Sequence, residues 1–349
     1  MVSENKKKLI SYCFIVFSTI MLLYILLSQN DILSIVNALR TIKLEYIYAA
    51  ILCIFGFWLL EAYMIYKLLL KYTYKKDGFK SFWLAIKTTL IGQYYSNITP
   101  GASGGQPVQL YVMNDDSVPL SEGTAILVEK FLLFQIGVTV YSFILFVYKL
   151  KSLFDYTNGA PLFVILGLIV NIVMIFSIWL ISIKPKAVSF VLYLIVDFLN
   201  KYNIIKNKNK NRIKDKIDSF IKDYEVSIKK MKGNVSLTIR LFFLTFIQLT
   251  LFFSITYFIY KSLNLSGNSI FEIICLQAFV YMSVSFIPIP GTMGVSEMGF
   301  VMLLGNIFLK NIIGTALLLW RGISYYFSLI FSGIFVLIVS IFKRFSISG

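Results

Sequence analysis

The chain has 349 residues, of which 58% are hydrophobic and 14% charged, and its formal net charge is +16. This composition is more apolar than one soluble core requires, and it indicates a protein that lies in a lipid bilayer. Because the chain has no histidine, three cysteines within apolar runs and no G-x-x-x-x-G-K-[ST] phosphate loop, we expect no metal, no cofactor, no disulfide framework and no direct ATP-driven pumping.

Six apolar stretches are long enough to cross a hydrocarbon core, which needs roughly 20 helical residues. In chain order they span residues 9–27, 46–66, 125–147, 162–183, 241–260 and 312–342. Two further stretches, 81–121 and 270–309, begin apolar and then break at a cluster of proline and glycine. A break of this kind ends a membrane helix before it has crossed the bilayer.

The basic residues indicate the orientation of these spans. They gather beside the hydrophobic stretches, in segments 6–8, 67–80, 184–232 and 343–344. The positive-inside rule places all four segments in the cytoplasm, so both termini lie inside. With this parity, the two broken stretches must each return to the side from which they enter, and they enter from opposite faces. The clustering beside spans also favours anionic lipid headgroups of the inner leaflet, and not nucleic acid, as partners of this charge.

The two broken stretches are similar to each other. PGASGGQ from Pro100 and PGTMGVSE from Pro290 share Pro-Gly-x-x-Gly, and each half places charge in a later apolar span. We therefore predict one membrane domain over residues 1–349, an all-α polytopic protein built on an inverted repeat. It would have about six full transmembrane helices and two oppositely inserted re-entrant helical hairpins.

The basic segment 184–232 carries apolar residues at helical spacing beneath a lysine-rich face. This pattern predicts amphipathic helices that either lie on the inner membrane surface or pack against each other as a pair. Residues 203–211, rich in lysine and asparagine, form the expected turn between them.

The first candidate site is the break in stretch 81–121, with the sequence NITPGASGGQP. A half-helix that follows such a break points free N–H groups and a positive dipole end at any cavity. An anionic group such as a lipid phosphate would bind there. Alternatively, the polar side chains only satisfy the broken backbone. The candidate substrate-binding residues are Asn97, Thr99, Pro100, Gly101, Gly104, Gly105 and Gln106.

The second candidate site is the break in stretch 270–309. Glu297 lies in the first turns of the outgoing helix, where it either caps free N–H groups or titrates and meets a cationic headgroup. We expect the two breaks to meet near the midplane, with Asn97, Gly104 and Gly294 lining a shared cavity. The candidate substrate-binding residues of this break are Pro290, Gly291, Gly294 and Glu297.

Charged side chains inside apolar spans form a third group, Glu129, Lys130 and Arg321. An unpaired charge there costs at least roughly 2.5 kcal/mol, so each should have a partner. Arg321 could pair with Glu129 or Glu297, or join the substrate-binding residues by binding a lipid phosphate. Glu129, Lys130 and Glu297 are the candidates for gating or coupling. Glu61 lies near the end of its stretch, so we expect an ordinary charge that reaches the interface.

Four motifs, in this order along the chain, resemble a known family. They are N-x-T-P-G-x-x-G-G-Q-P from Asn97, the adjacent Glu129 and Lys130, P-x-P-G-x-x-G-x-x-E from Pro288, and W-R-x-I-x-Y-Y from Trp320. Together they resemble the flippase-like family that includes the membrane domain of lysylphosphatidylglycerol synthases, and the match covers nearly the whole chain. The resemblance implies that many relatives carry a basic residue near the position of Gln109. Because glutamine has no charge, the preference of this chain for a lipid headgroup is expected to differ from theirs.

The resemblance implies movement of a lipid across the cytoplasmic membrane by a flippase or scramblase. The cargo would be a phospholipid or lipid-linked headgroup, aminoacyl phosphatidylglycerol among them, whose export gives resistance to cationic antimicrobial peptides. Because the chain ends at Gly349, just past the last span, we expect no aminoacyl-transferase domain, no lysyltransferase activity and no catalytic residue. The alternatives are a secondary transporter of a small solute or ion, and a membrane-embedded transferase that modifies a lipid.

We expect a multi-pass protein of a bacterial cell membrane whose partners are membrane lipids. A second copy of the chain or a separate lipid synthase is a further candidate partner. Without a nucleotide motif, movement would be downhill or coupled to an ion gradient or the membrane potential.

Overall fold

The computed structural model describes residues 40–73, 78–156, 160–183, 234–284, 294–308 and 312–347, with Thr292 and short pieces between 190 and 229. These residues form helices and no strand, so the protein is an all-α polytopic membrane protein, as predicted. The elements are α3 (Leu44–Tyr72), α4 (Gly78–Ile98), η1 (Pro100–Ala102), α5 (Gly105–Asp115), α6 (Leu120–Tyr156), α7 (Ala160–Ile183), α10 (Val235–Ser262), α11 (Ile270–Val284), α12 (Val295–Leu304), α13 (Ile313–Arg321), η3 (Gly322–Phe327) and α14 (Ser328–Ile347).

Within the described ranges, four helical stretches are long and apolar enough to cross a membrane. They are Leu44–Tyr72, Leu120–Lys149, Val235–Ser262 and Ile313–Phe342, and they contain four of the six predicted spans. The predicted span 162–183 coincides with the 24-residue helix α7. Span 9–27 lies outside the described residues, as do most of the basic segment 184–232 and its turn 203–211.

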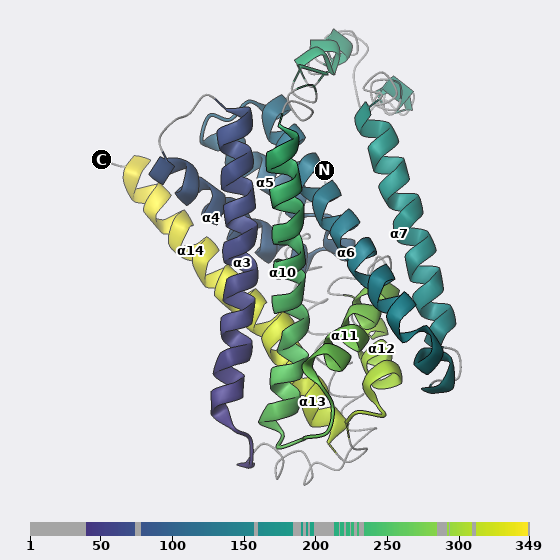
Figure 1. The fold of residues 1–349 in the computed structure, drawn as a ribbon. Coiled ribbons are helices and arrows are strands. Elements are labelled where there is room, and N and C mark those ends of the chain that lie inside the picture. The colour runs from purple at the N-terminus through teal and green to yellow at the C-terminus, as the bar shows by residue number, and fades with distance from the viewer. Residues whose placement is uncertain are drawn as a thin grey trace.

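Helices α3 and α10 pack against each other and run antiparallel (Figure 1). The start of α3 is tied to the end of α10, because the backbone N–H of Lys43 donates to the carbonyl of Ser262 at 2.9 Å. Asn264 Nδ2 also donates to the carbonyl of Thr41 at 2.8 Å. The end of α3 and the end of α10 therefore lie at opposite ends of the pair.

Each of these two helices leads into a pair of shorter helices that pack on one another. Helices α4 and α5 follow α3, and helices α11 and α12 follow α10. Figure 1 shows the first pair in the upper half of the view and the second pair in the lower half. The two helical hairpins consequently start at opposite ends of the molecule, and each is followed by a long helix, which is the arrangement of an inverted repeat.

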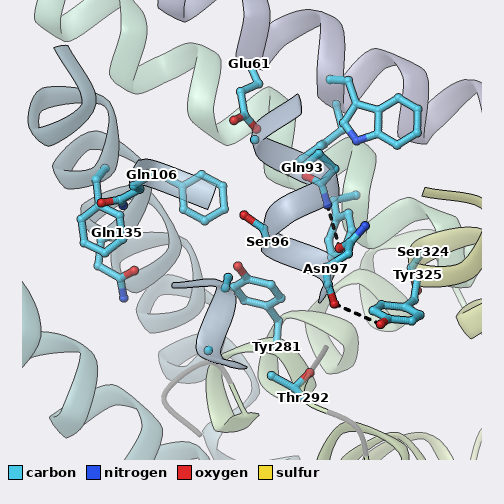
Figure 2. A pocket seen from close by; sticks show the side chains of 18 of the residues that line it. Glu61, Gln93, Ser96, Asn97, Gln106, Gln135, Tyr281, Thr292, Ser324 and Tyr325 are labelled. Atoms are coloured by element: carbon cyan, nitrogen blue, oxygen red, sulfur yellow. Dashed lines mark hydrogen bonds between the residues drawn. The ribbon is translucent and has the colours of Figure 1, made fainter. Parts of the chain in front are cut away.

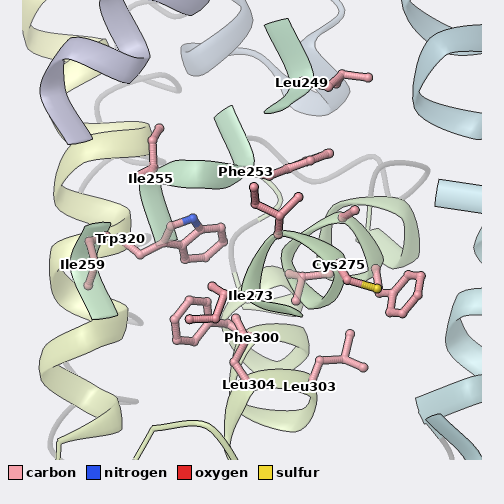
Figure 3. Packing of buried hydrophobic residues seen from close by; sticks show 14 of the residues in the cluster. Leu249, Phe253, Ile255, Ile259, Ile273, Cys275, Phe300, Leu303, Leu304 and Trp320 are labelled. Atoms are coloured by element: carbon pink, nitrogen blue, oxygen red, sulfur yellow. The ribbon is translucent and has the colours of Figure 1, made fainter. Parts of the chain in front are cut away.

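The second hairpin is the better buried of the two, because α11 packs against α6, α7 and α10 and α12 packs against α13. Figure 3 shows Phe253 of α10, Ile273 of α11 and Phe300 of α12 gathered there with Trp320 of α13. The rings of Phe300 and Trp320 stack with centroids 5.0 Å apart. By contrast, α7 and α14 expose large apolar side chains on their outer faces, as expected of helices that meet lipid; examples are Ile172, Phe176, Ile334 and Leu337.

Candidate functional site

A cavity of about 700 Å³ lies where the ends of the two hairpins approach each other (Figure 2). Its wall combines aromatic and aliphatic side chains with many polar ones, which is unusual in a fold this apolar. A polar group buried from water must have a partner or a function. The labelled polar side chains around the cavity are Glu61, Gln93, Ser96, Asn97, Gln106, Gln135, Tyr281, Thr292, Ser324 and Tyr325.

Thr99 stabilises the tip of the first hairpin by hydrogen bonds to residues on either side of the break. Its hydroxyl donates to the carbonyl of Tyr95 at 2.6 Å and accepts from the backbone N–H of Gly104 at 2.8 Å. Between them, Gly101 has φ +57°, a backbone conformation that glycine adopts without strain. Gly101 and Gln106 are exposed and line the cavity, so the tip forms part of its rim.

Gly104 and Gly105 have structural positions beside this tip. A Cβ atom on Gly104 would come within 2.6 Å of Thr99, and one on Gly105 would come within 2.0 Å of the Ser96 hydroxyl. The two glycines therefore let α5 start close against α4. Gly104 was expected to line the cavity, but it does not. The side of Gly104 on which a Cβ atom would lie faces Thr99.

Asn97 connects the first hairpin to the second half of the molecule. Its backbone carbonyl accepts from the hydroxyl of Tyr325 at 3.0 Å, and its Nδ2 donates to the hydroxyl of Ser328 at 3.3 Å. Gln93 Nε2 donates to its Oδ1 at 3.1 Å. Tyr325 belongs to η3, a π-helical turn between α13 and α14, and such turns are frequent at functional sites. Asn97 lines the cavity as predicted.

Arg321 pairs with Glu297, which was one of its two predicted partners. Its Nε donates to Glu297 Oε1 at 2.6 Å, and its Nη2 donates to the Ser296 hydroxyl. Both charged side chains are almost fully buried, and the guanidinium lies over the Trp320 ring at 4.9 Å. Arg321 lines the cavity, whereas Glu297 is absent from the lining. The pair therefore presents a neutralised cation to the cavity.

The second hairpin bends at a glycine in a left-handed conformation. Gly294 has φ +83° and precedes α12, and its carbonyl accepts from the backbone N–H of Met298 at 3.0 Å. Gly294 also does not line the cavity, contrary to our expectation. Pro290 and Gly291 lie outside the described residues.

Lys130 of α6 forms an ion pair with Glu61 of α3, and both side chains line the cavity. Glu61 is 9% exposed, so it is not the ordinary interfacial charge that we expected. Glu129, the neighbour of Lys130 in sequence, lies elsewhere. It accepts from Lys71 at 2.8 Å, from the Tyr72 hydroxyl at 2.7 Å and from the Thr238 hydroxyl at 3.0 Å.

Glu129 therefore joins α3, α6 and α10 and does not line the cavity. Adjacent residues of an α-helix point about 100° apart, which explains why the two charges serve different contacts. The predicted role of Glu129 in gating or coupling stays a prediction.

Residues 9–332 match the family model described as "Lysylphosphatidylglycerol synthase TM region". The chain belongs to this family. A UPF0104 membrane protein of Archaeoglobus fulgidus is 23% identical over 284 residues, 80% of this chain and 82% of the relative. A UPF0104 membrane protein of Pyrococcus horikoshii is 28% identical over 227 residues, 62% of this chain and 65% of the relative. No solved structure is significantly similar to the chain.

In this member of the lysylphosphatidylglycerol synthase transmembrane family, sequence reasoning missed several cavity residues, and Glu61 and Gln277 are two of them. Glu61 lies in a predicted span, and the cost of an unpaired charge there should have indicated a buried partner such as Lys130. Gln277 lies on α11 and is 1% exposed, and its Oε1 accepts from the Thr256 hydroxyl at 2.8 Å. A glutamine in the middle of an apolar segment was the available signal.

Proposed function

We propose that this chain moves the headgroup of a membrane lipid between the two leaflets of a cell membrane, with both termini in the cytoplasm. The observation that carries the proposal is the cavity of about 700 Å³, lined by polar and apolar side chains, at the ends of two opposed helical hairpins. Membrane lipids are then its partners, and a flippase or a scramblase is the activity.

The arrangement of the helices supports this function. Broken helices at membrane depth are tolerated where they are buried in protein or line a polar cavity, and opposed repeats allow such a cavity to open alternately to each side. The exposed tip of the first hairpin gives the cavity a rim, and the exposed apolar faces of α7 and α14 would meet the acyl chains. Polar headgroup and apolar chains would thus each have a surface of matching chemistry.

Family membership supports a lipid as the cargo. The family description suggests phosphatidylglycerol carrying an amino acid as one candidate among lipids. Export of that lipid would give resistance to cationic antimicrobial peptides. A separate synthase would then supply the lipid, and a second copy of the chain is a further possible partner.

Purified protein reconstituted into liposomes tests this proposal. A trace of headgroup-labelled fluorescent phospholipid is distributed over both leaflets, and dithionite then bleaches the outer leaflet. Protein-free liposomes should retain about half of the fluorescence, and proteoliposomes should lose most of it. Retention of half by both preparations, with every headgroup tried, would refute lipid movement. Uptake of a small solute in the same liposomes would then favour the transporter alternative.

A further inference from the structure

The charges around the cavity are balanced. The charged side chains that line it, within the described ranges, are Glu61, Lys130 and Arg321. Lys130 is paired with Glu61, and Arg321 is paired with the buried Glu297. An amine in the headgroup would have to displace one of these cations from its carboxylate. A bare phosphate would have to displace a carboxylate from its cation. Either exchange leaves a buried charge without its partner, which is costly.

Uncharged side chains supply the other polar groups of the lining, beside its aromatic and aliphatic side chains. Six side-chain amides line the cavity, and they come from four helices in both halves of the fold: Gln93, Asn97, Gln106, Gln109, Gln135 and Gln277. An amide offers both a donor and an acceptor, and so does a hydroxyl group of a ligand. A wall of amides therefore matches a ligand with several hydroxyl groups and needs no net charge.

Two buried donors at the cavity have no partner within the described part of the chain, Trp58 Nε1 and Gln277 Nε2. Their residues are 3% and 1% exposed, so water does not freely replace a missing partner. Thr256 donates to Gln277 Oε1 at 2.8 Å, which orients the amide with its N–H groups free. Neither N–H group is open to the cavity as it stands, so a ligand oxygen would satisfy these donors once the side chains around them shift.

From these observations we infer that the cavity selects a lipid headgroup rich in hydroxyl groups and free of amines, either a sugar or a glycerol. This inference rests on the proposed function, in which a lipid headgroup enters the cavity, and it adds the chemical class of that headgroup. Glycosyl diacylglycerol and phosphatidylglycerol are the two sources of this chemistry. The aminoacyl headgroup of lysylphosphatidylglycerol is disfavoured, because its ammonium groups would compete with Lys130 for Glu61.

Lipid binding to the purified protein, measured by native mass spectrometry, tests the inference without requiring transport. The arms are glycosyl diacylglycerol, phosphatidylglycerol, phosphatidic acid, phosphatidylethanolamine and lysylphosphatidylglycerol with identical acyl chains. At least one of the first two should bind about tenfold tighter than the last three. Which of the two binds identifies the source. Equal binding of phosphatidic acid would assign recognition to the phosphate, and tighter binding of either amine would favour a cationic headgroup; both results would overturn the inference.

Two variants test the residues that carry the argument. Trp58→Phe keeps an aromatic side chain but removes the indole N–H donor, so affinity for the hydroxyl-rich lipid should fall about three- to tenfold. Trp83→Phe is the matched control, because Trp83 is 45% exposed and does not line the cavity. Lys130→Gln frees Glu61 and should raise the affinity for lysylphosphatidylglycerol about tenfold. Unchanged affinities in both Trp58→Phe and Lys130→Gln would contradict the inference.

The same lipids in the leaflet-exchange assay separate this inference from the proposed function. Selective binding without exchange of any lipid would refute transport and still support the inferred class of headgroup. Exchange of all five lipids at one rate, without selective binding, would refute the headgroup class and leave transport standing.

Discussion

Glu129 and Lys130 are neighbours in the chain, yet they belong to two different ion pairs. Glu129 accepts from Lys71 at 2.8 Å where α3, α6 and α10 meet, and Lys130 pairs with Glu61 at the cavity. The first pair is 6% and 2% exposed, so it is a structural contact between helices. The pair of Glu61 and Lys130 lies at the cavity, where a ligand could contact it.

Glu129→Gln should therefore lower stability and leave transport intact in the protein that folds. The change removes the charge that accepts hydrogen bonds from Lys71, Tyr72 and Thr238, which costs about 3 kcal/mol, and thermal unfolding in detergent should show a lower Tm. Glu45→Gln is the control, because Glu45 is exposed in the first turn of α3. A normal Tm combined with an altered pH profile of lipid exchange would show instead that Glu129 couples transport to protons.

Exchanging the charges of the cavity pair tests whether Glu61 and Lys130 interact. Glu61→Lys or Lys130→Glu alone places like charges together and should abolish most lipid exchange. The double variant restores an opposite pair on the same two helices, so we expect it to recover a substantial part of the exchange rate. A double variant no better than the worse single variant would show that the two side chains act independently.

Arg321→Lys tests the buried pair with Glu297. Lysine keeps the charge, but its ammonium cannot reproduce the fork that donates to both Glu297 and Ser296. We expect a lower Tm, by the equivalent of about 1 to 3 kcal/mol, and slower lipid exchange. An unchanged Tm would show that the two hydrogen bonds of the guanidinium do not contribute to stability. Full exchange activity would exclude phosphate binding by Arg321.

Cysteine accessibility tests the orientation of the hairpins. Phe79 and Leu120 flank the first hairpin and are exposed, and Ser266 is exposed in the turn between α10 and α11. In a background without native cysteines, Phe79→Cys and Leu120→Cys should react with an impermeant maleimide only after the cells are opened. Ser266→Cys should react in intact cells. Labelling of the first two positions on different sides of the membrane would contradict a re-entrant hairpin.

The sequence was sufficient for the two pairs of short helices, because proline and glycine act locally. The orientation that the basic loops indicate stays a prediction. The sequence was insufficient for the rotation of each helix about its own axis. That rotation separates Glu129 from Lys130, brings Glu61 to the cavity and turns Gly104 toward Thr99. Packing between distant segments sets the rotation, and the sequence does not reveal that packing. For Arg321 alone, the sequence limited the candidate partners to two, Glu129 and Glu297.

Two serines allow a direct test of whether a lipid headgroup passes through this cavity. Ser324 lies in η3 and Ser340 in α14, which follows it directly, and each hydroxyl donates to a backbone carbonyl of the preceding turn. Ser324 lines the cavity, and Ser340 is exposed on the outer face.

Ser324→Phe adds a ring at the cavity wall, and Ser340→Phe adds the same ring outside it. The decisive measurement is the initial rate of lipid exchange in liposomes that contain equal amounts of folded variant. We predict that Ser324→Phe lowers this rate at least about tenfold and that Ser340→Phe leaves it near the wild-type value. Equal rates for the two variants would contradict passage through the cavity.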